Sequence, residues 1–170
     1  MNDNIRLSGI AYESLVNGPG LRRVFFSQGC NHNCKGCFNP ETHDFNSGKG
    51  ELDEEKMNFI LDLCDKEYIR GLSILGGEPM HPKNIGGVTK LAKMFKERFP
   101  DKNLWAWSGF LYDDLKDKEI MDYLDVLVDG RYMDELHDFR LEWRGSSNQR
   151  VIDIKKTKKQ GKIVIWKESK

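Results

Sequence analysis

The sequence has no excess of either charge and no long apolar run. Lys and Arg together number 27, as do Asp and Glu, so the formal net charge at pH 7 is +0. A chain without net positive charge offers no electrostatic argument for binding nucleic acid or an anionic membrane surface. No stretch approaches the roughly 18 apolar residues of a membrane-spanning helix, and the first residues lack the apolar core of a signal peptide. We therefore expect a cytoplasmic protein that binds neither nucleic acid nor membrane.

Cysteine is also scarce, with four residues in a chain of 170. In a reducing compartment such cysteines serve as metal ligands or buried thiols rather than as disulfides. A chain of this length buries about 70% of the surface that its unfolded form exposes, so it can fold without disulfides. The sequence also has no internal repeat and no long low-complexity segment. We expect a single domain over residues 1–170.

Three of the four cysteines, Cys30, Cys34 and Cys37, form a Cys-x3-Cys-x2-Cys motif. Thiolates are preferred ligands of zinc and of iron–sulfur clusters, and no second Cys-x-x-Cys pair follows to complete a four-thiolate site. Three thiolates can hold three irons of a 4Fe-4S cluster and leave the fourth iron with an open position, which marks a catalytic rather than a structural metal. Gly29 and Gly36 allow successive backbone N–H groups to turn toward an anionic cluster.

A zinc ion would need a fourth ligand beside these cysteines, and the candidates are Cys64, His32 and His43. Cys64 ends a series with the spacing of one helix face: Met57, Ile60, Leu61 and Cys64. This pattern predicts a cysteine in the core. We expect the two histidines to be exposed, because side chains between closely spaced ligands usually point outward. None of the three candidates has a standard zinc-ligand spacing, and a non-enzymatic zinc or iron–sulfur module is kept as an alternative.

Short apolar segments alternate with helical patterns along the chain. The expected strands are residues 22–26, 72–75, 104–107 and 125–130, and the expected helices begin near residues 52, 88 and 115. This alternation predicts stacked βα units with a parallel sheet. We expect an α/β fold, a partial open (βα) barrel of about six parallel strands, because the units are too few for a closed eight-fold barrel.

The C-terminal part of the chain has a different pattern. Residues 151–154 and 162–166 alternate enough to form two further strands. The lysine-rich segment between them, residues 155–161, ends in glycine and is expected to be a solvated hairpin tip.

Polar motifs follow each of the four expected parallel strands. Cys30 follows the first strand, the Gly-Gly-Glu-Pro segment at residues 76–79 follows the second, Ser108 follows the third, and Asp129 follows the fourth. The carboxyl ends of parallel strands form one edge of the sheet, and ligands collect there. We therefore expect these four motifs to meet in one site.

Two of these motifs resemble signatures of the radical S-adenosylmethionine (SAM) superfamily. The cysteine motif followed by Phe38 resembles the superfamily's cluster loop, and residues 76–79 resemble its Gly-Gly-Glu motif, which meets the methionine amino group of SAM. The resemblance implies a radical SAM core with a 4Fe-4S cluster on Cys30, Cys34 and Cys37, and SAM as the second cofactor. It also implies that the cluster and SAM carry the chemistry, with no catalytic side chain.

The resemblance further implies residue roles around SAM. Gly76 and Gly77 would let the backbone approach SAM closely, and the Glu78 segment would receive its ammonium group. Ser108 and Asp129 are candidates for the carboxylate side of SAM, the ribose or a bound cation, although Asp129 could equally cap its turn. Gly36 and Phe38 flank Cys37 and are candidates for contact with the adenine, with core packing as the alternative for Phe38.

A further segment resembles activases that make glycyl radicals: Asn17-Gly18-Pro19-Gly20, followed by Arg22. The chain is short, and a short open barrel suggests that a macromolecule supplies the lid. The sequence resembles most the anaerobic (class III) ribonucleoside-triphosphate reductase activating proteins, in the segments 107–110, 125–131 and 144–151 as well as in the motifs above. We expect the Gly18–Gly20 turn and Arg22 to line the entrance, with Arg144 or Arg150 in docking or structural ion pairs.

This family resemblance implies two partners. One is the large anaerobic ribonucleotide reductase subunit, a glycyl-radical enzyme, and the other is a small electron-donor protein such as flavodoxin. The alternatives among radical SAM proteins are a pyruvate formate-lyase-type activase and a small enzyme acting on a purine-like metabolite.

Overall fold

A computed structural model describes residues 5–169 of the chain. The strands (β), α-helices (α) and 3-10 helices (η) are, in chain order, β1 (Arg6–Ser14), β2 (Arg22–Gln28), η1 (Pro40–Thr42), α1 (Glu54–Cys64), β3 (Gly71–Gly76), α2 (Ile85–Arg98), β4 (Asn103–Ser108), α3 (Tyr112–Leu115), η2 (Glu119–Asp122), β5 (Val126–Asp129), η3 (Asp134–Leu136), β6 (Arg150–Asp153) and α4 (Ile154–Gln160). The six strands form one sheet in sequence order. The fold is therefore mixed α/β.

The sheet is only partly parallel. Strands β2 to β5 run parallel to one another, whereas β1 and β6 run antiparallel to their neighbours. The expectation of six parallel strands is therefore wrong for the two outer strands. The connection from β1 to β2, residues 15–21, is too short for the crossover that a parallel pair requires. In the described residues the sheet is open, with β1 and β6 at its two ends.

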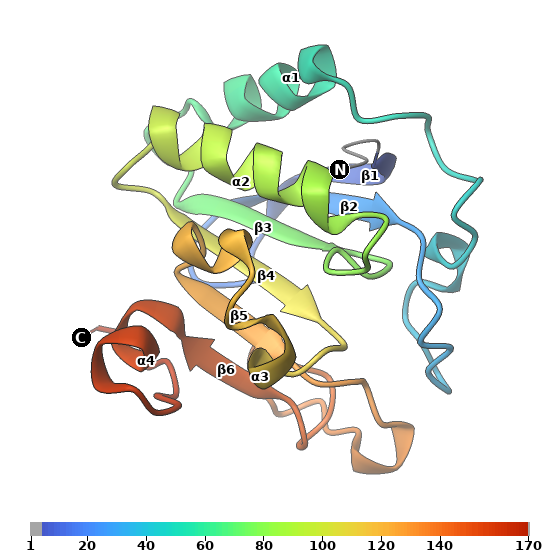
Figure 1. The fold of residues 1–170 in the computed structure, drawn as a ribbon, viewed down its shortest axis with the longest axis vertical. Helices are drawn as coiled ribbons and strands as arrows, with labels where there is room; N and C mark the ends of the chain where they lie inside the picture. Colours follow the sequence, from blue (N-terminus) through green and yellow to red (C-terminus); the bar gives the residue numbers. More distant parts are fainter. Residues whose placement is uncertain (1–4, 170) are drawn as a thin grey trace.

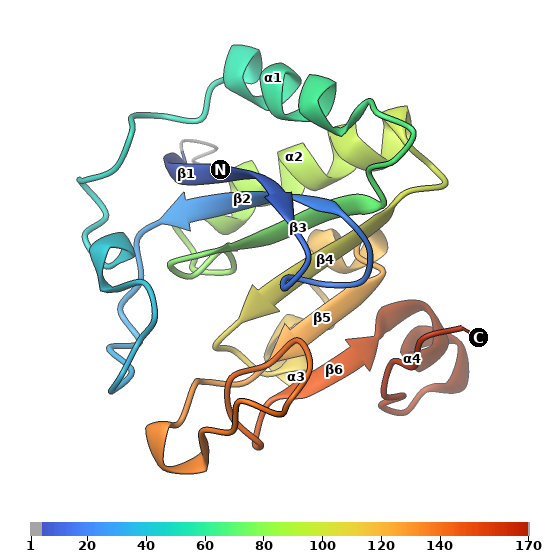
Figure 2. The ribbon, with the colours of Figure 1, turned by 180° about the vertical axis from the view of Figure 1, so that it is seen from behind.

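The helices α1 and α2 lie on one face of the sheet (Figure 1). The main core fills the space between them and the strands, with side chains such as Phe25, Ile74, Leu91 and Phe95 fully buried. The opposite face carries a smaller apolar group built around Trp105 and containing all four tryptophans of the chain. Loops, rather than α1 and α2, lie on that side (Figure 2). The two faces therefore differ, and the loop-covered face is the one that adjoins the cavities described below.

Helix α1 forms as its apolar spacing predicts. The side chain of Asp53 caps its N-terminus by accepting a hydrogen bond from the Lys56 N–H at 2.9 Å. Its buried residues are Met57, Ile60, Leu61 and Cys64. The prediction of a core cysteine at position 64 is confirmed. The third expected helix, by contrast, is replaced by two short elements, α3 and η2.

The lysine-rich segment near the C-terminus forms a helix, α4, and the expectation of a hairpin tip is wrong. The side chain of Asp153 caps this helix through the Lys156 N–H at 3.0 Å, and Gly161 ends it with φ 67. The following segment pairs with β6 only at a single bridge, between Ile152 and Ile165. A glycine after a polar segment thus marks a helix end here rather than a strand turn.

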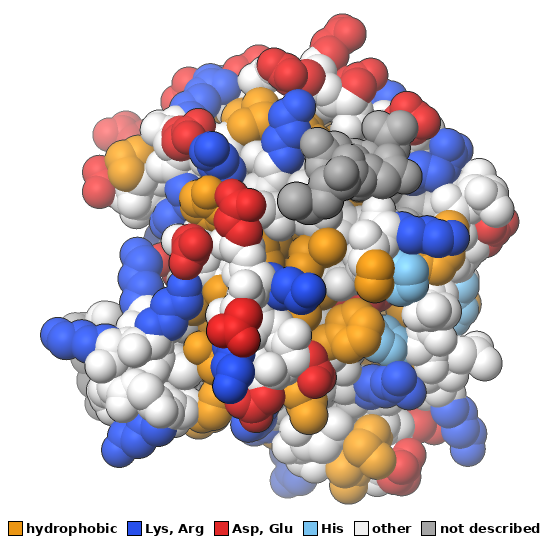
Figure 3. Space-filling view, viewed as in Figure 1, with side chains coloured by type: hydrophobic (Ala, Val, Ile, Leu, Met, Phe, Trp, Pro, Cys, Tyr) orange, Lys and Arg blue, Asp and Glu red, His pale blue; other side chains and the backbone are white. Residues whose placement is uncertain are grey.

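The helical face of the molecule mixes acidic and basic side chains (Figure 3). This pattern agrees with the zero formal net charge. Within residues 5–169, none of the helices combines the length and the apolar character needed to cross a bilayer.

Candidate active site

The parallel strands deliver their C-terminal ends to one edge of the sheet, beside the loop that carries the cysteines (Figure 1). A cavity of about 160 Å³ lies at this edge. Its lining includes the three clustered cysteines and the Gly-Gly-Glu segment: Cys30, Cys34, Cys37, Gly76, Gly77 and Glu78. Phe38 and Ser108 also line it, whereas Gly36 and Asp129 do not. The structure therefore brings together most, but not all, of the residues that the sequence singles out.

The cysteine loop needs glycine at two positions. Gly29 has φ +107 and Gly36 has φ +72, a region that other residues rarely adopt. A Cβ on Gly29 would also lie 2.1 Å from the ring of Phe45. Backbone hydrogen bonds from Gly29 to Thr42 (2.7 Å) and from Cys37 to Cys34 (3.2 Å) hold the loop in this turn. Glycine conformation and backbone hydrogen bonds therefore shape this turn.

The thiols differ in their surroundings. Burial raises the pKa of Cys30 and of Cys34 above the ordinary value of 9.0. Burial raises the pKa of Cys64 to about 12, in the core. A metal binds thiolate, so ligation by Cys30 and Cys34 would release protons. Cys64 lies among apolar side chains and is unsuited to ligation.

The donor set fits an iron–sulfur cluster better than a zinc ion. A zinc ion needs four ligands converging within about 2.3 Å of one point. Among residues 5–169, no three His, Cys, Asp or Glu side chains converge in this way. A cluster spreads its thiolates over several irons, so three separate cysteines lining one cavity suit it.

Glu78 joins three loops of the site. Its side chain is only 1% exposed. Its oxygens accept hydrogen bonds from the Met80 N–H (2.9 Å), the Ser108 hydroxyl (2.8 Å), the Gly109 N–H (2.7 Å) and His32 Nε2 (2.6 Å). A carboxylate has about four acceptor positions. All of the capacity of the Glu78 carboxylate is therefore used by the protein itself.

Both histidines near the cysteines lie in the protein rather than in solvent, and the expectation that they are exposed is wrong. The His32 side chain is 6% exposed because it reaches Glu78. His43 is half-buried, with Nε2 at 3.4 Å from the Cys37 sulfur. The His32 contact joins the cysteine loop to a segment far along the chain, whereas the His43 contact is local, between residues six apart.

The glycines of the Gly-Gly-Glu segment are needed for packing. A Cβ on Gly77 would lie 2.4 Å from the Gly29 carbonyl oxygen, and one on Gly76 would lie 2.3 Å from Ser27 backbone atoms. Gly76 also has φ +112. The segment therefore packs directly against the strand end that leads into Cys30, in addition to lining the cavity.

Asp129 is fully buried and engaged with other parts of the protein. It accepts hydrogen bonds from Arg150, at 3.0 Å from Nε and 2.5 Å from Nη2, and from the Tyr112 N–H at 2.8 Å. This contact ties β5 to β6 and to the start of α3. Arg150 thus forms the structural ion pair that the sequence left open, and Arg144 instead donates to backbone carbonyls of its own loop.

The Asn-Gly-Pro-Gly turn lies deeper than expected. Arg22 is fully buried and donates to the Ser73 hydroxyl at 2.7 Å and to the Pro19 carbonyl at 3.2 Å. A Cβ on Gly18 would lie 2.9 Å from the Arg22 side chain. Arg22 therefore anchors the turn from inside and does not line an entrance, which corrects the expectation.

A second cavity of about 570 Å³ adjoins the first. The two share the lining residues Phe38, Leu75, Trp107, Tyr132 and Gln149. Val16 from the β1–β2 loop and Phe139 from the β5–β6 loop line the larger cavity, with 75% and 92% of their surface exposed. Exposed apolar side chains around a cavity are typical of a protein-binding surface.

Sequence reasoning missed Gln149 as a site residue. Its side-chain oxygen accepts from the Gly145 and Ser146 N–H groups, and its nitrogen donates to the Gly130 carbonyl at 3.0 Å. Gln149 thereby shapes the β5–β6 loop beside both cavities. The sequence signal for Gln149 is its place in the polar segment at residues 144–150, a segment that carries the family resemblance.

Comparison with known proteins adds to this geometry. Residues 16–152 match the family model of a 4Fe-4S single cluster domain. The chain is 45% identical over 138 residues to the anaerobic ribonucleoside-triphosphate reductase-activating protein of Vibrio cholerae, covering 79% of this chain and 89% of the relative. The chain belongs to this family. The protein of the same name from Enterobacteria phage T4 is 42% identical (80% and 86% covered), and that from Escherichia coli K12 is 41% identical (83% and 94% covered).

Membership of the activating-protein family accounts for the three clustered thiols, because the matched domain is one that holds a single 4Fe-4S cluster. The match contains the cysteine loop, the Gly-Gly-Glu segment and the β5–β6 loop, and it ends within β6. Helix α4 and the segment after it lie outside the match. The cavities described above therefore fall within the part of the chain that the family model covers.

Proposed function

We propose that this chain is a radical SAM activase that generates a glycyl radical on an anaerobic ribonucleoside-triphosphate reductase. One observation carries the proposal: in a member of the activating-protein family, three cysteines and a Gly-Gly-Glu segment line one cavity at the C-terminal ends of parallel strands. The name of the relatives supports the reductase as the target. The deoxyribonucleotide chemistry itself would belong to that partner.

Within this proposal, Cys30, Cys34 and Cys37 hold the 4Fe-4S cluster. Gly76 and Gly77 line the cavity, and we assign their backbone carbonyl oxygens to accept hydrogen bonds from the ammonium group of SAM. The Glu78 carboxylate supplies negative charge behind this segment, and its own acceptor positions stay with the protein donors. When bound, the cluster and SAM together supply a one-electron cleavage and a hydrogen-atom abstraction.

The remaining candidate residues fall into two groups: those that line the cavity and those that contact only other parts of the protein. Ser108 and Phe38 line the cavity, so we assign them to direct contact with SAM. Gly36 acts through its backbone conformation, with φ +72, and a Cβ there would also lie 2.7 Å from the Asp134 side chain. Asp129 acts through Arg150 and the start of α3, and therefore holds the site together rather than meeting the ligand.

The larger cavity is proposed to receive the glycine-bearing segment of the reductase. It adjoins the cofactor cavity, so a segment bound there lies next to the site of hydrogen abstraction. Its apolar rim suits a protein partner, whose surface would then exclude water from the radical. A small-molecule substrate would leave this rim exposed.

We also propose the fold class, the domain organisation, the compartment and the electron donor of this protein. The open sheet would correspond to a partial (βα) barrel, and residues 1–170 would form a single radical SAM domain. The four free cysteines suit the reducing cytoplasm. A small electron-donor protein such as flavodoxin would reduce the cluster, and the zero net charge favours neither nucleic acid nor a membrane as a partner.

A partner-free assay tests the cofactor part of this proposal. The protein is reconstituted anaerobically with iron and sulfide, reduced with dithionite and mixed with SAM. The expected products are methionine and 5′-deoxyadenosine in equal amounts. Reduced, iron-loaded protein that leaves SAM intact would contradict the proposal.

A further inference from the structure

His32 belongs to the cysteine loop, but its side chain points into the protein. Its Nε2 lies 2.6 Å from Glu78 Oε2, and the side chain is 6% exposed. The ring also packs edge-on against Phe110, with centroids 4.8 Å apart. Because an ionised carboxylate only accepts hydrogen bonds, Nε2 carries the proton in this contact.

His32 connects two loops that the other donors to Glu78 do not connect. Met80 follows the Gly-Gly-Glu segment, and Ser108 and Gly109 end β4. Among the donors to this carboxylate in residues 5–169, His32 is the one from the cysteine loop. Its position between Cys30 and Cys34 ties the middle of that loop to Glu78, whereas the backbone bond from Glu78 N–H to the Gly29 carbonyl (2.8 Å) ties only its start.

Gly109 makes room for the imidazole. A Cβ on Gly109 would lie 2.6 Å from both the Cδ2 and Nε2 atoms of His32. Its φ is outside the left-handed region, so space rather than backbone conformation requires glycine at this position. The ring of His32 therefore occupies a place that any larger residue at 109 would take.

We propose that His32 is a positioning residue that sets the cysteine loop against the SAM-binding segment. The inference rests on the proposed function, because it assigns the cluster to one loop and SAM to the other. Through Glu78, His32 fixes the relative position of these two loops, so that both cofactors are held at one separation. Nothing in this role requires His32 to touch either cofactor.

The test compares SAM binding by wild-type protein, His32→Ala and His32→Gln, each reconstituted anaerobically to the same iron content. We expect His32→Ala to keep its iron and to bind SAM about tenfold more weakly, which corresponds to about 1.4 kcal/mol. His32→Gln should recover most of the affinity, because its amide nitrogen can donate to the same carboxylate oxygen. A control, His81→Gln, removes a nearby imidazole that donates nothing to Glu78, and should change the dissociation constant less than twofold.

A double-mutant cycle with Gly109→Ala separates the contact from a general loss of structure. In the wild-type background the new methyl group displaces the imidazole, so SAM binding should weaken several-fold. In the His32→Ala background the methyl group has space, and Gly109→Ala should then change the dissociation constant less than twofold. Thermal unfolding of the metal-free proteins should show the same non-additivity.

Three results would overturn the inference while leaving the proposed function intact. SAM binding by His32→Ala that equals or exceeds wild type would show that the contact does not help to position SAM. Loss of iron in His32→Ala would assign the residue to cluster assembly, and equal effects of Gly109→Ala in both backgrounds would remove the geometric basis. If wild-type protein itself fails to bind SAM, the proposed function fails first and the inference fails with it.

Discussion

At the scale of single residues, the four cysteines lie in two different environments. Cys30, Cys34 and Cys37 line the cavity at the strand ends, whereas Cys64 is fully buried in the main core. Sequence spacing alone separated them, because three thiols at x3 and x2 intervals indicate a metal site and a cysteine at helical spacing indicates a core position.

Iron content tests this division. Anaerobic reconstitution of Cys64→Ala should yield about four irons per chain, as one 4Fe-4S cluster requires, whereas Cys34→Ala should lose the cluster. Iron and sulfide analysis with the visible absorption spectrum provides the measurement. Retention of a full cluster by Cys34→Ala, or its loss from Cys64→Ala, would reverse the assignment.

Gly77 gives a second prediction at this scale. Gly77→Ala places a methyl group 2.4 Å from the Gly29 carbonyl oxygen, next to Cys30. We expect lower iron content as well as weaker SAM binding, with a loss of about 2 kcal/mol in the free energy of unfolding. Gly9→Ala is the matched control, because nothing lies within 4 Å of its added Cβ. Normal iron loading by Gly77→Ala would show that the two loops can separate without harm.

Some residue positions could be predicted from local motifs, whereas others depend on contacts between distant parts of the chain. The positions of the cysteines and of Gly76–Glu78 follow from local motifs. The roles of His32 and Arg22 depend instead on partners far along the chain, Glu78 and Ser73. From the sequence alone, a histidine within a cysteine motif and an arginine after a turn are both expected near the surface. Their buried positions depend on partners that only the folded sheet brings near.

At the scale of elements, the sequence predicts the central strands and the two long helices well. Strands β2 to β5 are short apolar runs, and α1 and α2 have a regular apolar face. Strand β1 is not predicted from the sequence. It is an outer strand with many partly exposed residues and two shifts in register, so buried and exposed side chains do not alternate along it. The sequence also fails to predict α4, in which only Ile154 and Thr157 are buried.

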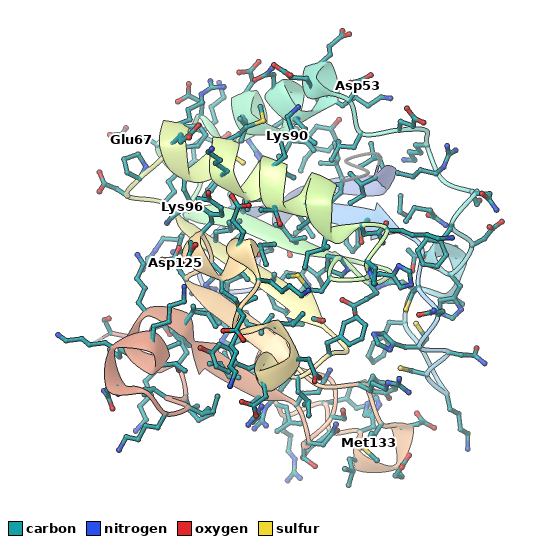
Figure 4. The ribbon with its side chains drawn as sticks, in the orientation of Figure 1. Asp53, Glu67, Lys90, Lys96, Asp125 and Met133 are labelled. Atoms are coloured by element: carbon teal, nitrogen blue, oxygen red, sulfur yellow. The ribbon has the colours of Figure 1, made fainter. Side chains whose placement is uncertain are left out.

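Asp125 connects several elements and gives a pH-dependent prediction. It accepts hydrogen bonds from Lys96 of α2 (2.8 Å) and from the Leu104 N–H of β4 (2.8 Å), and it pairs with Lys155 of α4 at 2.8 Å. Figure 4 shows Lys96 and Asp125 side by side. Burial of this carboxyl opposes ionisation, but the hydrogen bonds from Lys155, Lys96 and the Leu104 N–H outweigh it and lower its pKa below 3.8.

A lowered pKa in the folded state means that Asp125 stabilises the fold above its unfolded-state pKa and loses this effect as the pH falls below it. Asp125→Asn should cost about 2 kcal/mol in the free energy of unfolding at pH 7, and clearly less near pH 3. Chemical denaturation of the metal-free protein at both pH values gives the comparison. Asp122→Asn, which removes a more exposed pair with Lys158, should cost less than about 1 kcal/mol. An Asp125→Asn effect that is independent of pH would refute the ionic account.

At the scale of the whole molecule, the two faces of the sheet are covered differently. One face is covered by α1 and α2 and buries the main core (Figure 1). The other carries the tryptophan group and the larger cavity, bordered by the β1–β2 and β5–β6 loops. The face without α1 and α2 thus leaves the larger cavity, which adjoins the one lined by the three cysteines, open to a partner.

Phe139 tests whether this side receives the reductase. With 92% of its surface exposed, it can be replaced at little cost in stability. Phe139→Ser should lower the initial rate of reductase activation about tenfold, as expected for an apolar anchor in an interface, and leave partner-free SAM cleavage within twofold of wild type. Tyr68→Ser, at another exposed aromatic residue outside the two cavities, is the control. Equal activation by Phe139→Ser and wild type would place the docking surface elsewhere.

The central claim is that this chain abstracts a hydrogen atom from a backbone glycine of an anaerobic ribonucleotide reductase. The most direct measurement mixes the reduced, iron-loaded protein with SAM and the purified large reductase under anaerobic conditions and records the electron paramagnetic resonance spectrum. We expect a glycyl radical doublet that requires SAM and is absent with Cys34→Ala. Cleavage of SAM by the wild-type protein without any radical on the reductase would contradict it, and consumption of a purine-like metabolite in the same mixture would identify a small-molecule enzyme instead.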